Sequence, residues 1–134
     1  MRVLLLTGVL AGCSSSDQIE QQSKTAASAA QTVSVMLDAW MDGAAPFAYT
    51  AGTLRSTGKT LADAEAQIRS AGTAEPAEQS ALAAAIKNLS AAVARADAGL
   101  QADNRAEVQN AKQDLRRGSR TLATAYARYF APKP

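Results

Sequence analysis

The chain contains no histidine, one cysteine and few aromatic residues, with one Trp, three Tyr and two Phe among 134 residues. Without histidine, the commonest metal ligand and general base is missing. Without a second cysteine, a disulfide framework is impossible. The sequence also contains no Gly-x-Ser-x-Gly elbow, no metal-ligand spacing and no haem-attachment motif. These absences predict a protein that is not an enzyme and that holds no cofactor.

Excess charge of one sign and long apolar runs are absent as well. The 14 basic and 12 acidic residues leave a net charge of +2, which argues against a nucleic-acid binder, because such a protein shows a strongly basic patch or domain. The apolar stretch at residues 3–10 is much shorter than the ~20 residues of a membrane-spanning helix. Hydrophobic residues make up 47% of the chain, but 32 residues are alanine. We therefore expect a thin core with few large side chains.

The N-terminal residues carry the most informative motif. Arg2 precedes the apolar stretch, and Leu-Ala-Gly-Cys follows at residues 10–13. A basic start, an apolar stretch and a small-residue cleavage site together indicate an export signal. Because the small residues end on the only cysteine, Cys13, the segment resembles a bacterial lipoprotein signal peptide with its lipobox. In that family a diacylglycerol is attached to the cysteine thiol, the signal is removed before it, and the new amine is acylated.

The resemblance implies that residues 1–12 are cleaved and that Cys13 is lipidated, with residues 13–16 as a tether. Two or three acyl chains anchor a protein stably to a membrane, whereas one holds weakly. Ser14 stands where related inner-membrane lipoproteins carry Asp, so the resemblance favours the outer membrane and a domain that faces the periplasm. The alternative is an ordinary apolar N-terminus with an incidental free cysteine.

Beyond the tether, apolar residues recur at helical spacing in four segments of similar length. The predicted helices span residues 17–42, 46–71, 76–100 and 104–130. Gly43 and Pro46 separate the first two, and Gly72 and Pro76 separate the next two. Glycine is favoured just past a helix end and proline in the first turn of the next helix, so these residues place the breaks.

Two pairs of residues resemble capping boxes at helix starts, Asp17 with Glu20 and Asn104 with Glu107. Short breaks between helices of equal length favour antiparallel neighbours. We therefore predict an all-α fold, an antiparallel up-down-up-down four-helix bundle that forms one domain over residues 17–131. The alternative is an elongated helical coiled coil, as in the major murein lipoprotein, although regular glycine and proline breaks argue against a long stalk.

Residues 52–60 (Gly-Thr-Leu-Arg-Ser-Thr-Gly-Lys-Thr) resemble a phosphate-binding loop but place one residue too many between the glycines. They also lie inside a helical segment, so we interpret them as ordinary helix. Glycine within a helix costs about 1 kcal/mol relative to alanine, and Gly58 and Gly118 fall at similar depths in the predicted bundle. With Ala29 and Ala30 they form either a layer of close helix packing or the lining of a small apolar ligand site.

An acidic and aromatic group is expected at the end of the bundle far from Cys13. Trp40, Phe47 and Tyr49 should meet there. Asp38 and Asp42 lie one turn apart near a helix C-terminus, where negative charge is disfavoured. They are weak candidates for a hard-cation site with oxygen ligands, and the simpler interpretation is a solvated acidic surface.

A basic group is expected at the opposite end, where the fourth predicted helix finishes. After Asp114 this helix carries arginines and no acidic residue. The arginines are Arg116, Arg117, Arg120 and Arg128. Basic residues near a helix C-terminus complement the dipole. Beside a lipid anchor they are also candidates for contact with anionic head groups, at ~1 kcal/mol for each charge.

Together these patterns predict a lipid-anchored protein of the bacterial cell envelope. Its first hypothetical function is that of a non-enzymatic module that binds an envelope protein or a second copy of itself. The alternative is a helical bundle that binds a small apolar ligand or a hard cation. No pattern in the sequence names the partner.

Overall fold

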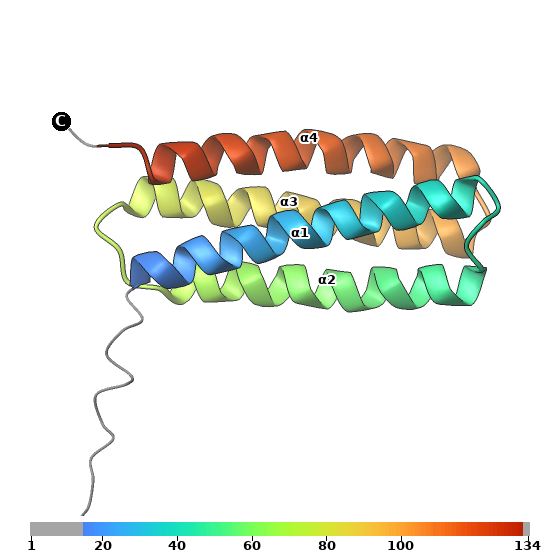
Figure 1. Ribbon diagram of the computed structural model, residues 1–134, viewed down its shortest axis with the longest axis horizontal. Coiled ribbons are helices and arrows are strands. Elements are labelled where there is room, and N and C mark those ends of the chain that lie inside the picture. The colour runs from blue at the N-terminus through green and yellow to red at the C-terminus, as the bar shows by residue number, and fades with distance from the viewer. Residues whose placement is uncertain (1–14, 133–134) are drawn as a thin grey trace, which may run out of the picture.

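The computed structural model describes residues 15–132, and these form four helices packed side by side (Figure 1). The helices are α1 (Ser15–Met41), α2 (Phe47–Ser70), α3 (Pro76–Gln101) and α4 (Arg105–Tyr129). Each helix reverses the direction of the one before it, and the described residues contain no strand. The predicted all-α, up-down-up-down four-helix bundle is confirmed. The elongated coiled coil is wrong, because each helix packs against at least two others.

Helix ends lie within two residues of their predicted positions, and one difference changes the interpretation of the N-terminal region. Helix α1 begins at Ser15, so the tether predicted for residues 13–16 is too long. Asp17 does not cap the helix but lies in its first turn, where the positive end of the helix dipole favours a carboxylate. The predicted signal peptide and Cys13 lie outside the described residues. Helix α1 therefore starts only two residues after Cys13.

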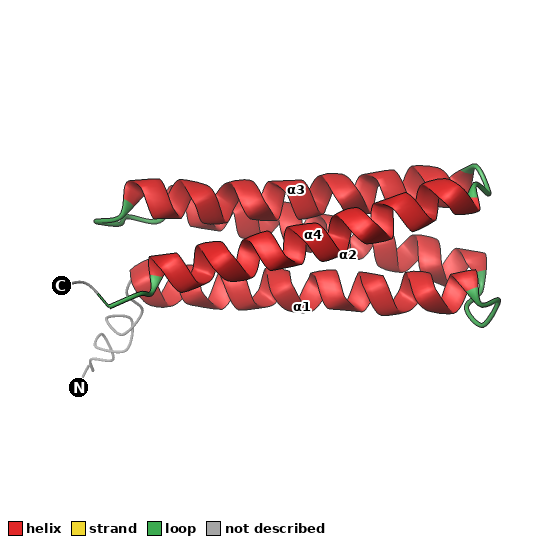
Figure 2. Ribbon diagram, turned by 90° about the horizontal axis from the view of Figure 1, so that it is seen from above, coloured by secondary structure: helices red, strands yellow, loops and turns green. Residues whose placement is uncertain are grey.

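Successive helices are neighbours, and α4 returns beside α1 to close the bundle (Figures 1 and 2). The contact between α1 and α4 is less extensive than the contacts between successive helices. The start of α1, the loop at residues 71–75 and the end of α4 share one end, called here the proximal end. The loops at residues 42–46 and 102–104 lie at the other, distal end. The first turn of α1 and the last turn of α4 thus lie at the same end of the bundle.

Both distal turns use a residue with positive φ to end a helix. Gly43 has φ of 78°, and Asp103 has φ of 51°. After α3, the Asn104 N–H donates to the Gly99 carbonyl at 2.8 Å, the long hydrogen bond of a Schellman motif. The Asn104 side chain also accepts from the Glu107 N–H at 3.1 Å. The predicted cap at Asn104 is therefore confirmed, and one residue ends α3 and starts α4.

At the proximal end, the loop between α2 and α3 is held by side chains from two helices. Gln79 Nε2 donates to the carbonyls of Ile68 and Ala71, both at 2.6 Å, which satisfies the C-terminus of α2. The hydroxyls of Thr73 and Tyr129 share a hydrogen bond of 2.7 Å. The loop is thereby tied to the last turn of α4.

The core is thin and rich in alanine, as its composition predicts. Large side chains such as Leu61, Leu89 and Leu122 are buried, and many of the other buried core residues are alanines. Polar residues also occupy buried core positions, namely Ser23, Thr50, Thr57 and Lys112. Small residues let the helices approach closely, so the few large side chains fill the space between them.

Candidate functional site

The glycine layer predicted from the sequence lies against α3. A β-carbon on Gly118 would lie 2.8 Å from Leu89 Cδ2, whereas one on Gly58 would lie 3.7 Å from Val93 Cγ1. Gly118 is thus in tight contact with α3, and Gly58 leaves space for a methyl group. Ala30 of α1 is buried and Ala29 is partly buried. This geometry favours close helix packing at Gly118 over a ligand cavity.

Of the two candidate cation ligands at the distal end, one is held in an ion pair and the other is exposed. Asp38 forms an ion pair with Lys112 Nζ of α4. Lys112 is only 8% exposed, so Asp38 neutralises a nearly buried ammonium group. Asp42 is exposed at the end of α1. Residues 15–132 contain no group of three or more His, Cys, Asp or Glu side chains that could hold a metal ion.

The aromatic residues predicted at the distal end do not form one cluster. Trp40 is partly buried, and the Arg105 guanidinium lies 5.5 Å from the centre of its ring. Arg105 also donates to the Met41 carbonyl. Phe47 and Tyr49 are exposed on the first turn of α2. The distal contact between α1 and α4 therefore uses Arg105, together with the ion pair of Asp38 with Lys112, rather than stacking between aromatic rings.

The loop-like sequence at residues 52–60 lies in the middle of α2. Its backbone N–H groups are engaged in helical hydrogen bonds, so they cannot form the cradle that holds phosphate in a nucleotide-binding loop. Thr57 is buried among the core residues. The structure agrees with the interpretation of this segment as helix.

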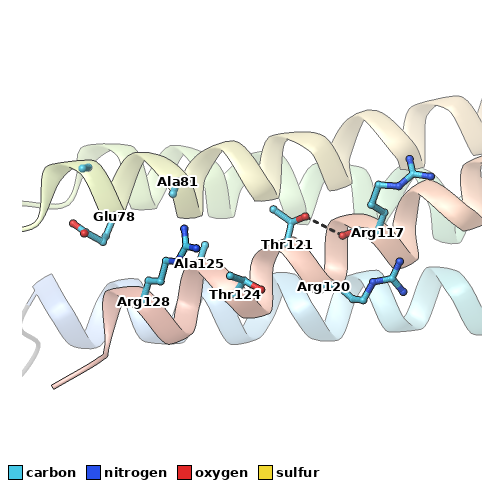
Figure 3. A pocket seen from close by; sticks show the side chains of 9 residues that line it. Glu78, Ala81, Arg117, Arg120, Thr121, Thr124, Ala125 and Arg128 are labelled. Atoms are coloured by element: carbon cyan, nitrogen blue, oxygen red, sulfur yellow. Dashed lines mark hydrogen bonds between the residues drawn. The ribbon is translucent and has the colours of Figure 1, made fainter.

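A groove of about 500 Å³ runs between α3 and α4 and contains three of the four predicted contact arginines (Figure 3). We call it the arginine groove. Its lining residues are Ala77, Glu78, Ala81, Arg117, Arg120, Thr121, Thr124, Ala125 and Arg128. Helix α3 supplies small side chains and one acid, while α4 supplies hydroxyls and all the positive charge. Arg116 is exposed on α4 but does not line the groove.

The arginines of the groove differ in their partners. Arg117 donates to Asp114 at 3.0 Å, and Asp114 also binds Arg95 of α3 at 2.7 Å. Arg120 and Arg128 form no ion pair with any residue in the described part of the chain. Two guanidinium groups therefore face solvent with their hydrogen-bonding capacity open to a partner.

The predicted cluster of arginines at the end of the chain is instead a stripe along α4. Arg128 lies in the last turn of the helix. Arg117 lies 11 residues earlier, roughly 16 Å further along the axis at 1.5 Å per residue. The arginines are spread along one side of the bundle and are not gathered at the proximal end.

A second feature, in the contact between α1 and α4, escaped the sequence analysis. The Tyr126 hydroxyl donates to Glu20 Oε2 at 3.2 Å, and Lys24 Nζ lies 3.1 Å from the same oxygen. Lys24 holds the pKa of Glu20 below its ordinary value, and the Tyr126 hydroxyl acts in the same direction. Burial and the neighbouring carboxylate raise the pKa of Tyr126. One carboxylate thus joins α1 to the last turns of α4.

The burial of Ser23 in α1 could have been predicted from the sequence. The buried positions of α1 include Ile19, Ser23, Ala26, Ala30 and Val33, at alternating spacings of four and three. A polar residue at such a heptad position stands out, because core positions normally carry apolar side chains. The alternation of four- and three-residue spacings, and not the seven-residue interval alone, is the signal that places Ser23 in the core.

No helix in residues 15–132 combines the length and the apolar character required to cross a lipid bilayer. The chain matches no family model, and no curated protein or solved structure was found to be similar to it.

Proposed function

We propose that the protein is a lipid-anchored module of the bacterial cell envelope that binds an acidic surface of a partner protein in the arginine groove, without catalysis. The observation that carries this proposal is the pair Arg120 and Arg128. Both line a groove, and neither forms an ion pair within residues 15–132. The smaller side chains on the α3 wall leave room for a partner between the two helices.

The anchor rests on the lipobox resemblance at Cys13. Helix α1 starts two residues beyond it, and two extended residues span at most about 7 Å. A lipid on Cys13 would therefore hold the proximal end of the bundle at the membrane. The stripe from Arg117 to Arg128 would then rise from the membrane along the side of the bundle, where it is accessible to a neighbouring protein.

The arrangement of charge suits partner recognition. Arginine binds carboxylates through a planar fork of donors, and charge complementarity between surfaces raises the association rate and excludes wrong partners. Thr121 adds little, because its hydroxyl donates to the Arg117 carbonyl at 3.1 Å. Selectivity would therefore come from the positions of Arg120 and Arg128.

A crosslinking experiment in cells tests whether a partner protein binds in the arginine groove. A photo-crosslinking amino acid at Thr124, which lines the groove, should give one discrete product with an envelope protein. Arg120→Glu together with Arg128→Glu should abolish that product, because the charge of the groove is reversed. Arg55→Glu is the matched control, since Arg55 is exposed on α2, away from the groove.

Localisation tests the anchor separately. Cys13→Ser should release the protein from the membrane fraction and remove the incorporation of labelled fatty acid. A crosslinked product at Thr124 that persists in the charge-reversed variant would contradict partner binding in the arginine groove. Loss of the product in Arg120→Glu and Arg128→Glu, accompanied by loss of binding to anionic vesicles, would assign the arginines to lipid head groups instead.

A further inference from the structure

A second groove lies at the contact between α1 and α4, near the proximal end. We call it the seam groove. Its lining residues are Ser23, Lys24, Ala27, Ser119, Leu122, Ala123 and Tyr126. Its volume is about 270 Å³. Apart from Ser23, Ser119 and the tips of Lys24 and Tyr126, its walls are formed by carbon atoms.

Ser23 supplies an independent sign of a ligand. It is only 2% exposed, and its hydroxyl has no hydrogen-bond partner within residues 15–132. Buried hydroxyls are nearly always hydrogen-bonded, because burial without a partner is costly. Alanine at this position would fill the same core site without that cost. The unsatisfied hydroxyl therefore indicates a polar group that enters the seam groove.

The rim of the seam groove already binds a carboxylate, that of Glu20. Glu20 Oε2 accepts from the Tyr126 hydroxyl at 3.2 Å and lies 3.1 Å from Lys24 Nζ. The Glu20 side chain is 39% exposed and contacts Lys24 and Tyr126, two residues that line the groove, so it is free to turn towards solvent. A donor pair that holds one carboxylate would hold another, which a ligand brings with it.

We infer that the seam groove binds an alkyl carboxylate, a free fatty acid of medium chain length, whose head group displaces Glu20. The carboxylate would accept hydrogen bonds from Tyr126, Lys24 and Ser23. The alkyl chain would lie along Ala27, Leu122 and Ala123, with its end towards Ser119. The ligand would cover the contact between α1 and α4, which is less extensive than the contacts between successive helices.

The dimensions of the groove set the length of the chain. A dry protein cavity of about 150 Å³ holds benzene, so a groove of 270 Å³ holds roughly ten carbon atoms at the same density. From Ser119 to Tyr126 is seven residues, roughly 10 Å of helix. Decanoate matches both figures, so it is the probe for the test.

Binding is measured by titration of decanoate into the full chain that carries Cys13→Ser, so that no attached acyl chain competes. Amide NMR shifts should change at Ser23, Ala27 and Ala123, and heat should be released in calorimetry. The same titration with 1-decanol tests the head group. Decanoate should bind at least several times more tightly than decanol. Equal affinities, or no shifts at these three residues, would overturn the inference.

Two variants, one at Glu20 and one at the buried Ser23, separate ligand binding from a merely structural role. Glu20→Gln should raise the affinity for decanoate, because the competing charge is removed, although the helix contact itself loses its ion pair. Ser23→Ala should raise the melting temperature of the free protein and weaken decanoate binding about tenfold. Ser28→Ala, at an exposed position of α1, is the matched control and should change neither. Unchanged affinity for decanoate in both Glu20→Gln and Ser23→Ala would overturn the inference.

A variant that fills the groove completes the test. Ala27→Leu should remove decanoate binding while the bundle stays folded, as judged by circular dichroism. Ala62→Leu adds the same side chain at an exposed position of α2 and should leave binding unchanged. Full binding to the Ala27→Leu protein would place the ligand elsewhere and overturn the inference. None of these readouts involves the arginine groove, so this test and that of the proposed function fail independently.

Discussion

A β-carbon on Gly118 of α4 would lie 2.8 Å from Cδ2 of Leu89 in α3. Atoms in protein cores do not pack that closely, so the missing side chain at residue 118 is what allows α4 to approach α3 at this level. Leu89 is fully buried and surrounded by other core side chains, which limits its freedom to move away. A side chain at residue 118 would therefore force Leu89 to shift within the core.

Gly118→Ala should lower the free energy of unfolding. Overpacking costs about 1–3 kcal/mol, and the better helix propensity of alanine returns about 1 kcal/mol. Gly52→Ala is the matched control, because a β-carbon there meets no atom within 4 Å. It should stabilise the protein by about 0.5–1 kcal/mol. Urea denaturation measures the free energy of unfolding of both variants. If Gly118→Ala and Gly52→Ala change it in the same direction, close packing of Gly118 against Leu89 would be contradicted.

The ion pair between Asp38 and Lys112 should show unequal effects when either partner is removed. Asp38→Ala leaves the nearly buried ammonium of Lys112 without its partner, at a cost of about 1–3 kcal/mol. Lys112→Met removes the buried charge and keeps most of the side-chain volume. It should change stability by less than about 1 kcal/mol. Thermal denaturation of the two single variants measures the asymmetry, and a larger loss in Lys112→Met would contradict it.

The contact of Glu20 with Lys24 should weaken in acid. The folded protein holds the pKa of Glu20 below its ordinary value of 4.5, so the carboxylate stabilises the fold above that pH. This contribution is lost as the pH falls below 4.5 and through the lowered pKa. Carboxyl ¹³C NMR of Glu20 should show the lowered midpoint. Lys24→Met should raise the midpoint more than Tyr126→Phe, because Lys24 is the larger cause.

Asp103→Gly should stabilise the turn between α3 and α4. Asp103 has φ of 51°, which glycine adopts without a steric penalty. Part of the gain is offset by the greater freedom of glycine in the unfolded chain, so we expect about 0.5–1 kcal/mol. Asp97→Gly, inside α3, is the control and should lower stability by about 0.3 kcal/mol, because aspartate is itself a poor helix former. A loss of stability in Asp103→Gly would show that the aspartate side chain has its own role in the turn.

The sequence alone determined the number, order and direction of the helices. The breaks between helices are marked by Gly43, Pro46 and Pro76. These residues act on the backbone within a few positions, so the helix ends that they produce can be predicted from the sequence. The cap at Asn104 is local for the same reason, since its side chain bonds the Glu107 N–H three residues ahead. The start of α1 at Ser15 was missed, because no glycine or proline marks where that helix begins.

Only the tertiary structure decided which residues share a groove. Arg120 and Arg128 face the small side chains of α3 because of the rotation of α4 about its axis, which depends on packing across the whole bundle. Tyr126 meets Glu20 across 106 residues of sequence. Ser23 is left unsatisfied because no acceptor or donor from α4 reaches it. Contacts between distant segments depend on the relative rotation and depth of the helices, and these emerge only when all four helices pack together.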